Sequence, residues 1–128
     1  MHTYRLSAAA TVLGVSDDTL RRWVDAGRLP SRVDDAGRRV VAGTDLAAFA
    51  ATVAGDPAGP GDTSARNRFE GIVTRVLRGD VMSQVEVQSG PHRLVSLIST
   101  EAVDALALEP GAPAVASVKA TNVVVELP

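Results

Sequence analysis

The order of apolar and polar positions divides this 128-residue chain into a helical first half and a strand-forming second half. Before residue 55, apolar side chains recur three and four positions apart, as on one face of an α-helix. After residue 63, they alternate with polar side chains, as in strands with one buried face. Residues 55–63 contain no apolar side chain larger than Ala or Pro. The pattern predicts two small domains, 1–54 and 64–128, joined by a Gly/Pro linker at 55–63.

The first half is predicted to hold three helices. Hydroxyl residues stand where each is expected to begin and are predicted to be N-caps: Ser7, Ser16 and Thr44. In the second helix, Leu20, Trp23 and Val24 form a buried stripe, and Gly27 is expected to end the helix. Residues 33–41 then predict a small β-hairpin that turns near Asp35-Ala36-Gly37. Helices with one hairpin predict an α-rich winged helix-turn-helix domain.

The second half is predicted to be a small β-barrel. A short helix, Thr100–Leu106, is expected after its cap Ser99. The expected strands are Phe69–Leu77, Ser83–Gln88, Arg93–Ile98, Ala114–Lys119 and Asn122–Glu126. Five short strands with one helix before the fourth predict a partly open five-stranded barrel of the OB type. The whole chain is thus predicted to be an α+β protein of two domains.

Composition excludes several classes of protein. There is no cysteine, so disulfide scaffolds and thiolate metal sites are excluded. His2 and His92 are isolated and are expected to be exposed, so no metal cation is expected. No apolar run approaches the roughly 18 residues of a membrane span, and the N-terminal residues do not resemble a signal peptide. We expect a cytoplasmic protein without a membrane partner. Catalytic triads, paired catalytic carboxylates and Gly-rich phosphate loops are not found, so an enzyme is not expected.

The charge pattern requires any nucleic-acid contact to be local. The formal net charge is −2, and residues 1–54 hold seven Arg and six Asp. Hydrogen-bond donors suited to DNA occur on the second helix and around the hairpin, namely Ser16, Thr19, Arg21, Arg22, Arg28, Arg32, Arg38 and Arg39. An alternative is that Asp18–Arg22 and Arg21–Asp25, which are four residues apart, form ordinary surface ion pairs.

The first half resembles a known DNA-binding family. The residues that carry the resemblance are the run 8–23, the Ala-Gly-Arg-Leu-Pro segment at 26–30 and Gly-Arg-Arg at 37–39. Over about Tyr4 to Val53 they resemble the excisionase and MerR-like winged helix-turn-helix family. The resemblance implies that double-stranded DNA is a partner. It also implies that the second helix enters the major groove while the hairpin lies along the backbone.

Two short segments of the second half concentrate donors for an anion. Ser64-Ala65-Arg66-Asn67 has no carboxylate, and Lys119-Ala120-Thr121 contains the single lysine of the chain. Ser99 opens a helix, where free amides and the helix dipole favour a negative charge. The predicted oxyanion-binding residues are Ser64, Arg66, Asn67, Ser99, Lys119, Ala120 and Thr121. Taken singly, each has an ordinary alternative role as a turn residue, a helix cap or a solvated strand residue.

The same segments resemble a second family. Ser-Ala-Arg-Asn at 64–67, Phe-Glu-Gly-Ile-Val at 69–73, Leu-Ile-Ser-Thr-Glu-Ala-Val at 97–103, Leu-Glu-Pro-Gly at 108–111 and Val-Lys-Ala-Thr at 118–121 follow its order. Over about Thr63 to Leu127 the chain resembles the molbindin family, whose Mop domains are classed with the TOBE fold. The resemblance implies binding of molybdate or tungstate between subunits, with Ser64, Arg66, Ser99, Lys119 and Ala120 around one oxyanion. A single Mop copy then implies a homo-oligomer, a hexamer or a dimer.

Three functions follow as hypotheses. The first is a molybdate-responsive transcriptional regulator that binds DNA. The second is an intracellular molybdate storage or homeostasis protein whose N-terminal domain does not regulate transcription. The third is a DNA-binding protein in which the barrel serves only for oligomerisation.

Overall fold

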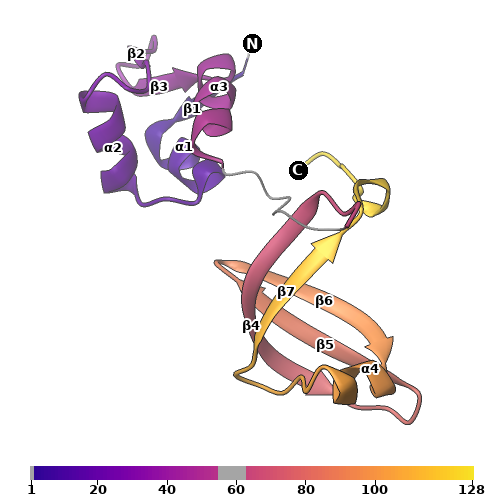
Figure 1. Ribbon diagram of the computed structural model, residues 1–128. Coiled ribbons are helices and arrows are strands. Elements are labelled where there is room, and N and C mark those ends of the chain that lie inside the picture. The colour runs from indigo at the N-terminus through magenta and orange to yellow at the C-terminus, as the bar shows by residue number, and fades with distance from the viewer. Residues whose placement is uncertain (1, 55–62) are drawn as a thin grey trace. The chain divides into compact units, whose positions relative to one another are not determined.

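The computed structural model describes residues 2–54 and 63–128. The chain divides into two compact units, Met1–Gly55 and Asp56–Pro128 (Figure 1). The predicted linker at 55–63 lies, except for Thr63, outside the described residues. Within the described ranges, every helix is too short or too polar to traverse a lipid bilayer.

The N-terminal unit packs three helices and a small antiparallel sheet around one core. Its elements are β1 (Thr3–Arg5), α1 (Leu6–Leu13), α2 (Asp17–Asp25), β2 (Arg32–Val33), β3 (Arg39–Ala42) and α3 (Gly43–Val53). The sheet has the order β1-β3-β2. Leu20 and Val41 are completely buried in the core, and Leu46 and Phe49 cover them from α3. Helical spacing of apolar residues thus builds this unit, as predicted.

The second helix agrees with the sequence prediction. Ser16 is its N-cap, and the Ser16 hydroxyl accepts a hydrogen bond from the Thr19 amide at 3.1 Å. Leu20 and Val24 are buried, and Trp23 is half-buried against the same core. The helix ends at Asp25, and Gly27 follows with a φ of +75°, a left-handed conformation that glycine adopts without strain.

The predicted hairpin is also present. Arg32 pairs with Val40 and Val33 with Arg39. In the turn, the Asp34 carboxylate accepts hydrogen bonds from the amides of Ala36 and Arg38, each at 2.9 Å. The side chain of Asp34 therefore fixes the turn that leads through Arg38 into Arg39, the first residue of β3.

Two of the predicted helix caps are wrong. The first helix begins at Leu6 rather than after Ser7, and the third begins at Gly43 rather than after Thr44. Neither helix has a side-chain cap, because strand pairing sets where each one starts. The strand β1, which the sequence pattern missed, pairs with β3 directly before α1, and the Gly43 amide donates to the His2 carbonyl at 2.7 Å.

The C-terminal unit is a curled antiparallel sheet with one short α-helix and a 3₁₀ turn (Figure 1). Its elements are β4 (Asn67–Leu77), β5 (Met82–Ser89), β6 (His92–Ser99), α4 (Thr100–Ala105), β7 (Pro113–Val118) and the 3₁₀ helix η1 (Ala120–Asn122). The strand order is β6-β5-β4-β7. Ser99 caps α4 as predicted, accepting a hydrogen bond from the Ala102 amide at 3.1 Å. The architecture is OB-like.

The fifth strand predicted at Asn122–Glu126 is wrong for the single chain. The four strands above form the described sheet, and after η1 the chain has no regular structure up to Pro128. Val124, Val125 and Leu127 are 85%, 91% and 92% exposed. The apolar pattern favours a strand, but a strand is stable only beside a neighbour, and this segment pairs with none within the described chain.

The curl of the sheet depends on close contact between β4 and β5. A Cβ atom at Gly71 would lie 2.0 Å from the Gln88 carbonyl oxygen, so no other residue fits there without a backbone shift. The register of these strands also shifts between Val73 and Arg75. The curled inner face encloses a core of Val73, Val85, Val87 and Val103.

Candidate functional sites

The pairing of β4 with β7 brings the two predicted donor segments together. Asn67 is opposite Val118 at the end of the ladder, and the Asn67 amide donates to the Val118 carbonyl at 3.1 Å. Arg66 and Lys119 are the next residues along these strands, so both segments lie at one end of the sheet (Figure 1). Six of the seven predicted oxyanion-binding residues belong to this end; the seventh is Ser99.

A tight turn presents the first segment. The Thr63 hydroxyl accepts a hydrogen bond from the Ala65 amide at 3.1 Å. Ala65 is 7% exposed, whereas Ser64 and Arg66 on either side of it are exposed. Burial of the small alanine thus leaves a hydroxyl and a guanidinium facing water.

The second segment continues into η1. The Asn122 amide donates to the Lys119 carbonyl at 2.9 Å, and no side chain caps the start of this helix. The amides of Ala120 and Thr121, in its first turn, have no acceptor within the helix. Among the ion pairs found in residues 2–54 and 63–128, none involves Arg66 or Lys119. This end of the sheet therefore combines positive charge with exposed donors.

Ser99 lies at the opposite end of the sheet. It pairs with Met82 where β6 runs into α4, while Asn67 begins the 11-residue strand β4 at the other end. A strand of that length spans roughly 35 Å. The Ser99 hydroxyl accepts the Ala102 amide, and the Thr100 amide donates to the Val81 carbonyl at 2.8 Å. Two of the amides expected to be free at this helix are thus occupied, and Ser99 does not join the other six residues within one chain.

At the start of α2, three of the predicted DNA-binding residues form a chain of hydrogen bonds. The Ser16 hydroxyl donates to the Thr19 hydroxyl at 3.0 Å, and the Arg22 guanidinium donates to the same oxygen at 3.3 Å. Arg21 is exposed on the same helix. The alternative ion pairs of Arg22 with Asp18 and of Arg21 with Asp25 are absent from the described residues, because Arg22 contacts Thr19 and Asp25 pairs elsewhere.

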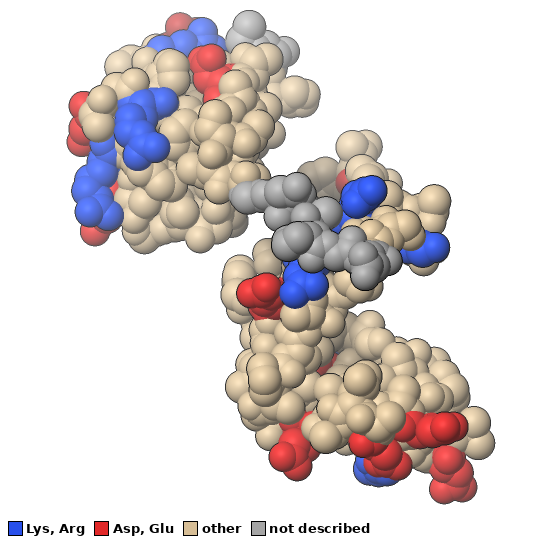
Figure 2. All heavy atoms as spheres, in the orientation of Figure 1, with Lys and Arg blue, Asp and Glu red and all other residues tan. Residues whose placement is uncertain are grey.

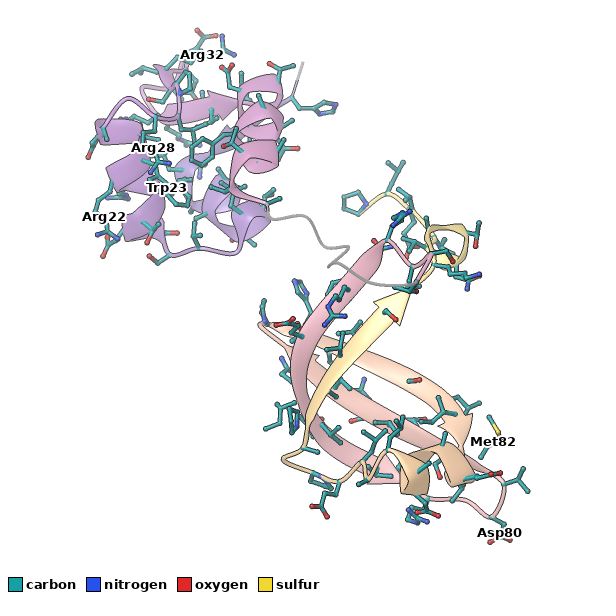
Figure 3. All side chains as sticks on the ribbon, in the orientation of Figure 1. Arg22, Trp23, Arg28, Arg32, Asp80 and Met82 are labelled. Carbon is teal, nitrogen blue, oxygen red and sulfur yellow. The ribbon has the colours of Figure 1, made fainter. Side chains whose placement is uncertain are left out.

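The guanidinium of Arg28 lies over two aromatic rings. Its guanidinium carbon lies 5.9 Å from the ring centroid of Trp23 and 5.9 Å from that of Phe49 (Figure 3). The two rings are in contact, with their centroids 5.1 Å apart. This cation–π contact, which sequence analysis did not predict, holds an exposed cation close to α2.

The arginines of the hairpin differ in their contacts. Arg39 pairs with Asp25 at 3.2 Å and also reaches the Ser31 hydroxyl at 3.5 Å. The side chains of Arg32 and Arg38 are exposed. Figure 2 shows basic side chains over this unit with acidic ones among them, so the face in view is of mixed charge with local basic patches. Among the predicted DNA-binding arginines, Arg39 is therefore the one whose side chain forms an ion pair within the domain.

The C-terminal unit also has an apolar groove along its open side. The groove has a volume of about 560 Å³ and is lined by residues of β5 and of the two edge strands β6 and β7. Val85, Val87, Ile98, Leu108 and Ala116 are among its lining residues.

His2 and His92 are exposed, as predicted. Within residues 2–54 and 63–128, no three or more His, Cys, Asp or Glu side chains are grouped to hold a metal ion.

Comparison with known proteins agrees with this division. Residues 63–125 match the TOBE domain and residues 3–53 match a helix-turn-helix domain. The molybdenum-pterin-binding protein 2 of Clostridium pasteurianum is 35% identical over 63 residues, which are 48% of this chain and 93% of that protein. The molybdenum-pterin-binding protein MopA of Rhodobacter capsulatus is 37% identical over 70 residues, 54% of this chain but 26% of its own length.

A solved structure with bound ligand shares the fold of the C-terminal unit. It is that of the cytoplasmic molybdate-binding protein ModG with molybdate bound, at 36% identity and a TM-score of 0.51, covering 54% of this chain and 50% of that one. The two units therefore define a helix-turn-helix protein with an OB-like second domain. The chain belongs to the TOBE-domain family. Both resemblances predicted from the sequence are confirmed.

Proposed function

We propose that this protein is a molybdate-responsive transcriptional regulator. It binds molybdate or tungstate through its C-terminal domain, 64–128, and double-stranded DNA through its N-terminal domain, 1–54, which residues 55–63 link. The observation that carries the proposal is the meeting of Arg66 and Lys119 at the end of the β4–β7 ladder. This cationic end belongs to a domain whose relatives are named for binding molybdenum compounds or molybdate.

The donors at this end suit a tetrahedral dianion. Molybdate presents four oxygen acceptors, and the guanidinium of Arg66 and the ammonium of Lys119 supply charge-assisted hydrogen bonds of about 1.5–3 kcal/mol each. The hydroxyls of Ser64 and Thr121 and the amide of Ala120 add neutral donors. After the costs of desolvation, such a set supports affinity of about −8 kcal/mol, a micromolar dissociation constant.

We place the complete site between subunits. Six candidate residues lie at one end of the sheet and Ser99 lies at the other, so one chain cannot bring all seven around one anion. The α4 end of a second copy would bring its Ser99 to the Arg66 and Lys119 of the first. A second chain would also exclude water from the bound anion and strengthen each charged hydrogen bond.

The apolar groove supports the assembly of copies. Strands β6 and β7 are the two edges of the sheet, and the groove lies on the face between them. The segment Val123–Leu127 has the apolar content of a missing strand, yet Val124, Val125 and Leu127 are almost fully exposed. We assign the groove to this segment of a second copy, because insertion would pair an open strand edge and bury apolar side chains. The resulting homo-oligomer is a dimer or a hexamer.

In the DNA complex, α2 enters the major groove. Arg21 and Arg22 then reach base edges or phosphates, with Ser16 and Thr19 beside them. Arg28, Arg32 and Arg38 contact the backbone, and Arg39 joins them when its bond to Asp25 opens. One module of this size covers too few base pairs for tight specific binding, so assembly through the C-terminal domain supplies a second module. Oxyanion binding at subunit boundaries then biases the arrangement of the DNA-binding modules.

Calorimetric titration with sodium molybdate tests the ligand. We expect micromolar binding to the intact protein and a loss of at least tenfold in affinity for Lys119→Ala. Arg68→Ala is the matched control, because Arg68 is a nearby cation on the same ladder that is already paired with Glu70 at 3.6 Å. Absence of binding by the intact protein, or equal losses in both variants, contradicts the proposed site.

A gel shift with the protein's own upstream DNA, with and without molybdate, tests the regulatory function. We expect a shifted complex whose midpoint concentration changes when molybdate is added. If molybdate binds but DNA is not shifted in either condition, the protein is a storage or homeostasis protein. A shift that molybdate does not change, together with no calorimetric signal, assigns the barrel to oligomerisation alone. The mass of the protein in solution, measured with and without residues 123–128, tests whether this segment of one copy occupies the groove of another. We expect the truncated protein to have a smaller mass per assembly.

A further inference from the structure

We infer that Asn67 is a positioning residue that holds Lys119 in place, and that it is not itself an oxyanion ligand. The inference rests on the function proposed above. It separates Asn67 from its neighbours Ser64 and Arg66, although all three stand in one short segment.

The side chain of Asn67 is committed to the opposite strand. Its Nδ2 atom donates to the carbonyl of Val118 at 3.1 Å, a contact between residues 51 positions apart. Asn67 and Val118 are also the last pair of the β4–β7 ladder, which runs from Ile72 and Pro113. The side-chain bond therefore closes the ladder immediately before Lys119.

The face of the strand supports the same assignment. Side chains alternate between the two faces of a strand, so Asn67 shares the face of Phe69 and of the buried Val73. Arg68 and Glu70, on the other face, are exposed, and Arg66 continues their alternation. Val118, opposite Asn67, faces inward with it, so the next residue, Lys119, alternates to the face of Arg66. The side-chain amide of Asn67 thus lies on the face of the sheet opposite to that of Arg66 and Lys119.

The clamp matters because Lys119 has a long and flexible side chain. Ordering such a side chain on an anion costs conformational entropy, and the cost rises when the backbone that carries it is also mobile. Val118 is the last residue of β7, and η1 begins directly after Lys119. Without the Asn67 amide, the end of the ladder frays and the backbone of residues 118–122 loses its fixed position. We expect a five- to tenfold loss of molybdate affinity, the effect of one neutral hydrogen bond.

The test compares Asn67→Ala and Asn67→Ser with a matched control. Ser89→Ala is that control, because the Ser89 hydroxyl donates to the Glu70 carbonyl at 2.7 Å and forms the same kind of cross-strand bond between β5 and β4. All variants are made in the full chain and titrated with sodium molybdate in the calorimeter. Amide hydrogen exchange is measured on peptides that cover residues 115–123. We expect faster exchange there and weaker binding in both Asn67 variants, and neither change in Ser89→Ala.

A double-mutant cycle with Lys119→Ala separates positioning from direct ligation. If Asn67 acts mainly through Lys119, Asn67→Ala weakens binding much less in the Lys119→Ala background than in the wild type, because only Ala120 and Thr121 are then left to be positioned. An equal loss in both backgrounds, or unchanged exchange at residues 115–123, overturns the inference, as does unchanged affinity in both Asn67 variants. If the intact protein binds no molybdate, the proposed function fails and the positioning role fails with it. The exchange measurement then still shows whether Asn67 clamps the strand.

Discussion

Glu86 and Arg93 form an ion pair across β5 and β6 in which the carboxylate is buried and the guanidinium is exposed. The side chain of Glu86 is 8% exposed, and that of Arg93 is 59% exposed. The pKa of Glu86 lies below its ordinary value of 4.5, mainly because the carboxylate accepts a hydrogen bond from Arg93. Burial of the carboxylate raises this pKa, whereas the positive charge of Arg93 and a hydrogen bond from Gln84 lower it further. A lowered pKa in the folded protein makes stability depend on pH.

The pair predicts loss of stability in acid. Because the folded pKa of Glu86 lies below the unfolded value, its contribution is fully present above pH 4.5 and is lost as the pH falls through the folded pKa. Urea unfolding of the wild type and of Glu86→Gln between about pH 3 and pH 7 checks this. We expect the variant to be less stable near neutrality and the gap to narrow in acid. Glu70→Gln is the control, because Glu70 pairs with Arg68 at an exposed position, and we expect its stability to match that of the wild type. The prediction is contradicted if the stability of Glu86→Gln differs from that of the wild type by the same amount at every pH.

Ala107 predicts a stabilising substitution. It follows α4 with a φ of +52°, a left-handed conformation that strains a residue with a Cβ atom. Its amide donates to the Asp104 carbonyl at 3.1 Å, and the Leu108 amide donates to the Val103 carbonyl at 3.0 Å, so the conformation is fixed by the helix end. Ala107→Gly should raise the free energy of unfolding by about 0.5–1 kcal/mol. Ala105→Gly, at the last helical residue of α4, should lower it, and the melting temperatures of the two variants should move in opposite directions.

The two roles of Ser99 are separable by substitution. Ser99→Ala removes the cap of α4 and should cost about 1 kcal/mol of stability. Ser99→Asp retains a cap, because a carboxylate accepts the Ala102 amide, but it adds a negative charge beside the proposed anion. We therefore expect Ser99→Asp to melt close to the wild type and to bind molybdate at least tenfold more weakly. Wild-type affinity of a well-folded Ser99→Asp variant would limit Ser99 to its capping role.

The features that sequence predicted correctly depend on neighbouring residues. Ser16 caps α2 through a bond to Thr19, three positions away, and Ser99 caps α4 in the same manner. The predictions at Ser7 and Thr44 were wrong because distant strand pairing, not the local hydroxyl, decides where those helices begin. N-cap chemistry is local, whereas the start of a helix that follows directly from a strand is set by the sheet.

The site shows the same limit. Residue types alone predicted an anion site at Arg66 and Lys119, but the proximity of these two residues depends on a strand register that joins positions about fifty residues apart. The contact of Asn67 with Val118 has no local signal, because any nearby acceptor would suit an amide. The prediction of a strand at Asn122–Glu126 was wrong for a related reason. Alternation of apolar residues is a local signal, but the neighbouring strand that a strand requires is not within the described chain.

The contact of Arg28 with two aromatic rings predicts that a lysine cannot replace it in the proposed DNA binding. The guanidinium carbon lies 5.9 Å from the ring centroids of both Trp23 and Phe49, and a lysine ammonium lacks the planar, delocalised group that favours such contacts. Arg28→Lys should weaken DNA binding by about three- to tenfold without changing the salt dependence, because the charge is kept. Arg28→Ala should weaken it further and reduce the slope of log K against log salt by about one.

Fluorescence anisotropy of labelled duplex DNA at several salt concentrations measures both quantities. Arg78→Ala is the control for loss of one positive charge, because Arg78 pairs with Asp104 in the C-terminal unit at 2.8 Å. Its affinity and slope should equal those of the wild type, since DNA contacts are assigned to the N-terminal unit. If Arg28→Lys binds as tightly as the wild type, the aromatic contact has no part in DNA binding and only the charge of Arg28 matters. If Arg78→Ala loses as much affinity as Arg28→Ala, the loss reflects the net charge of the protein and not a contact of Arg28 with DNA, and the prediction is contradicted.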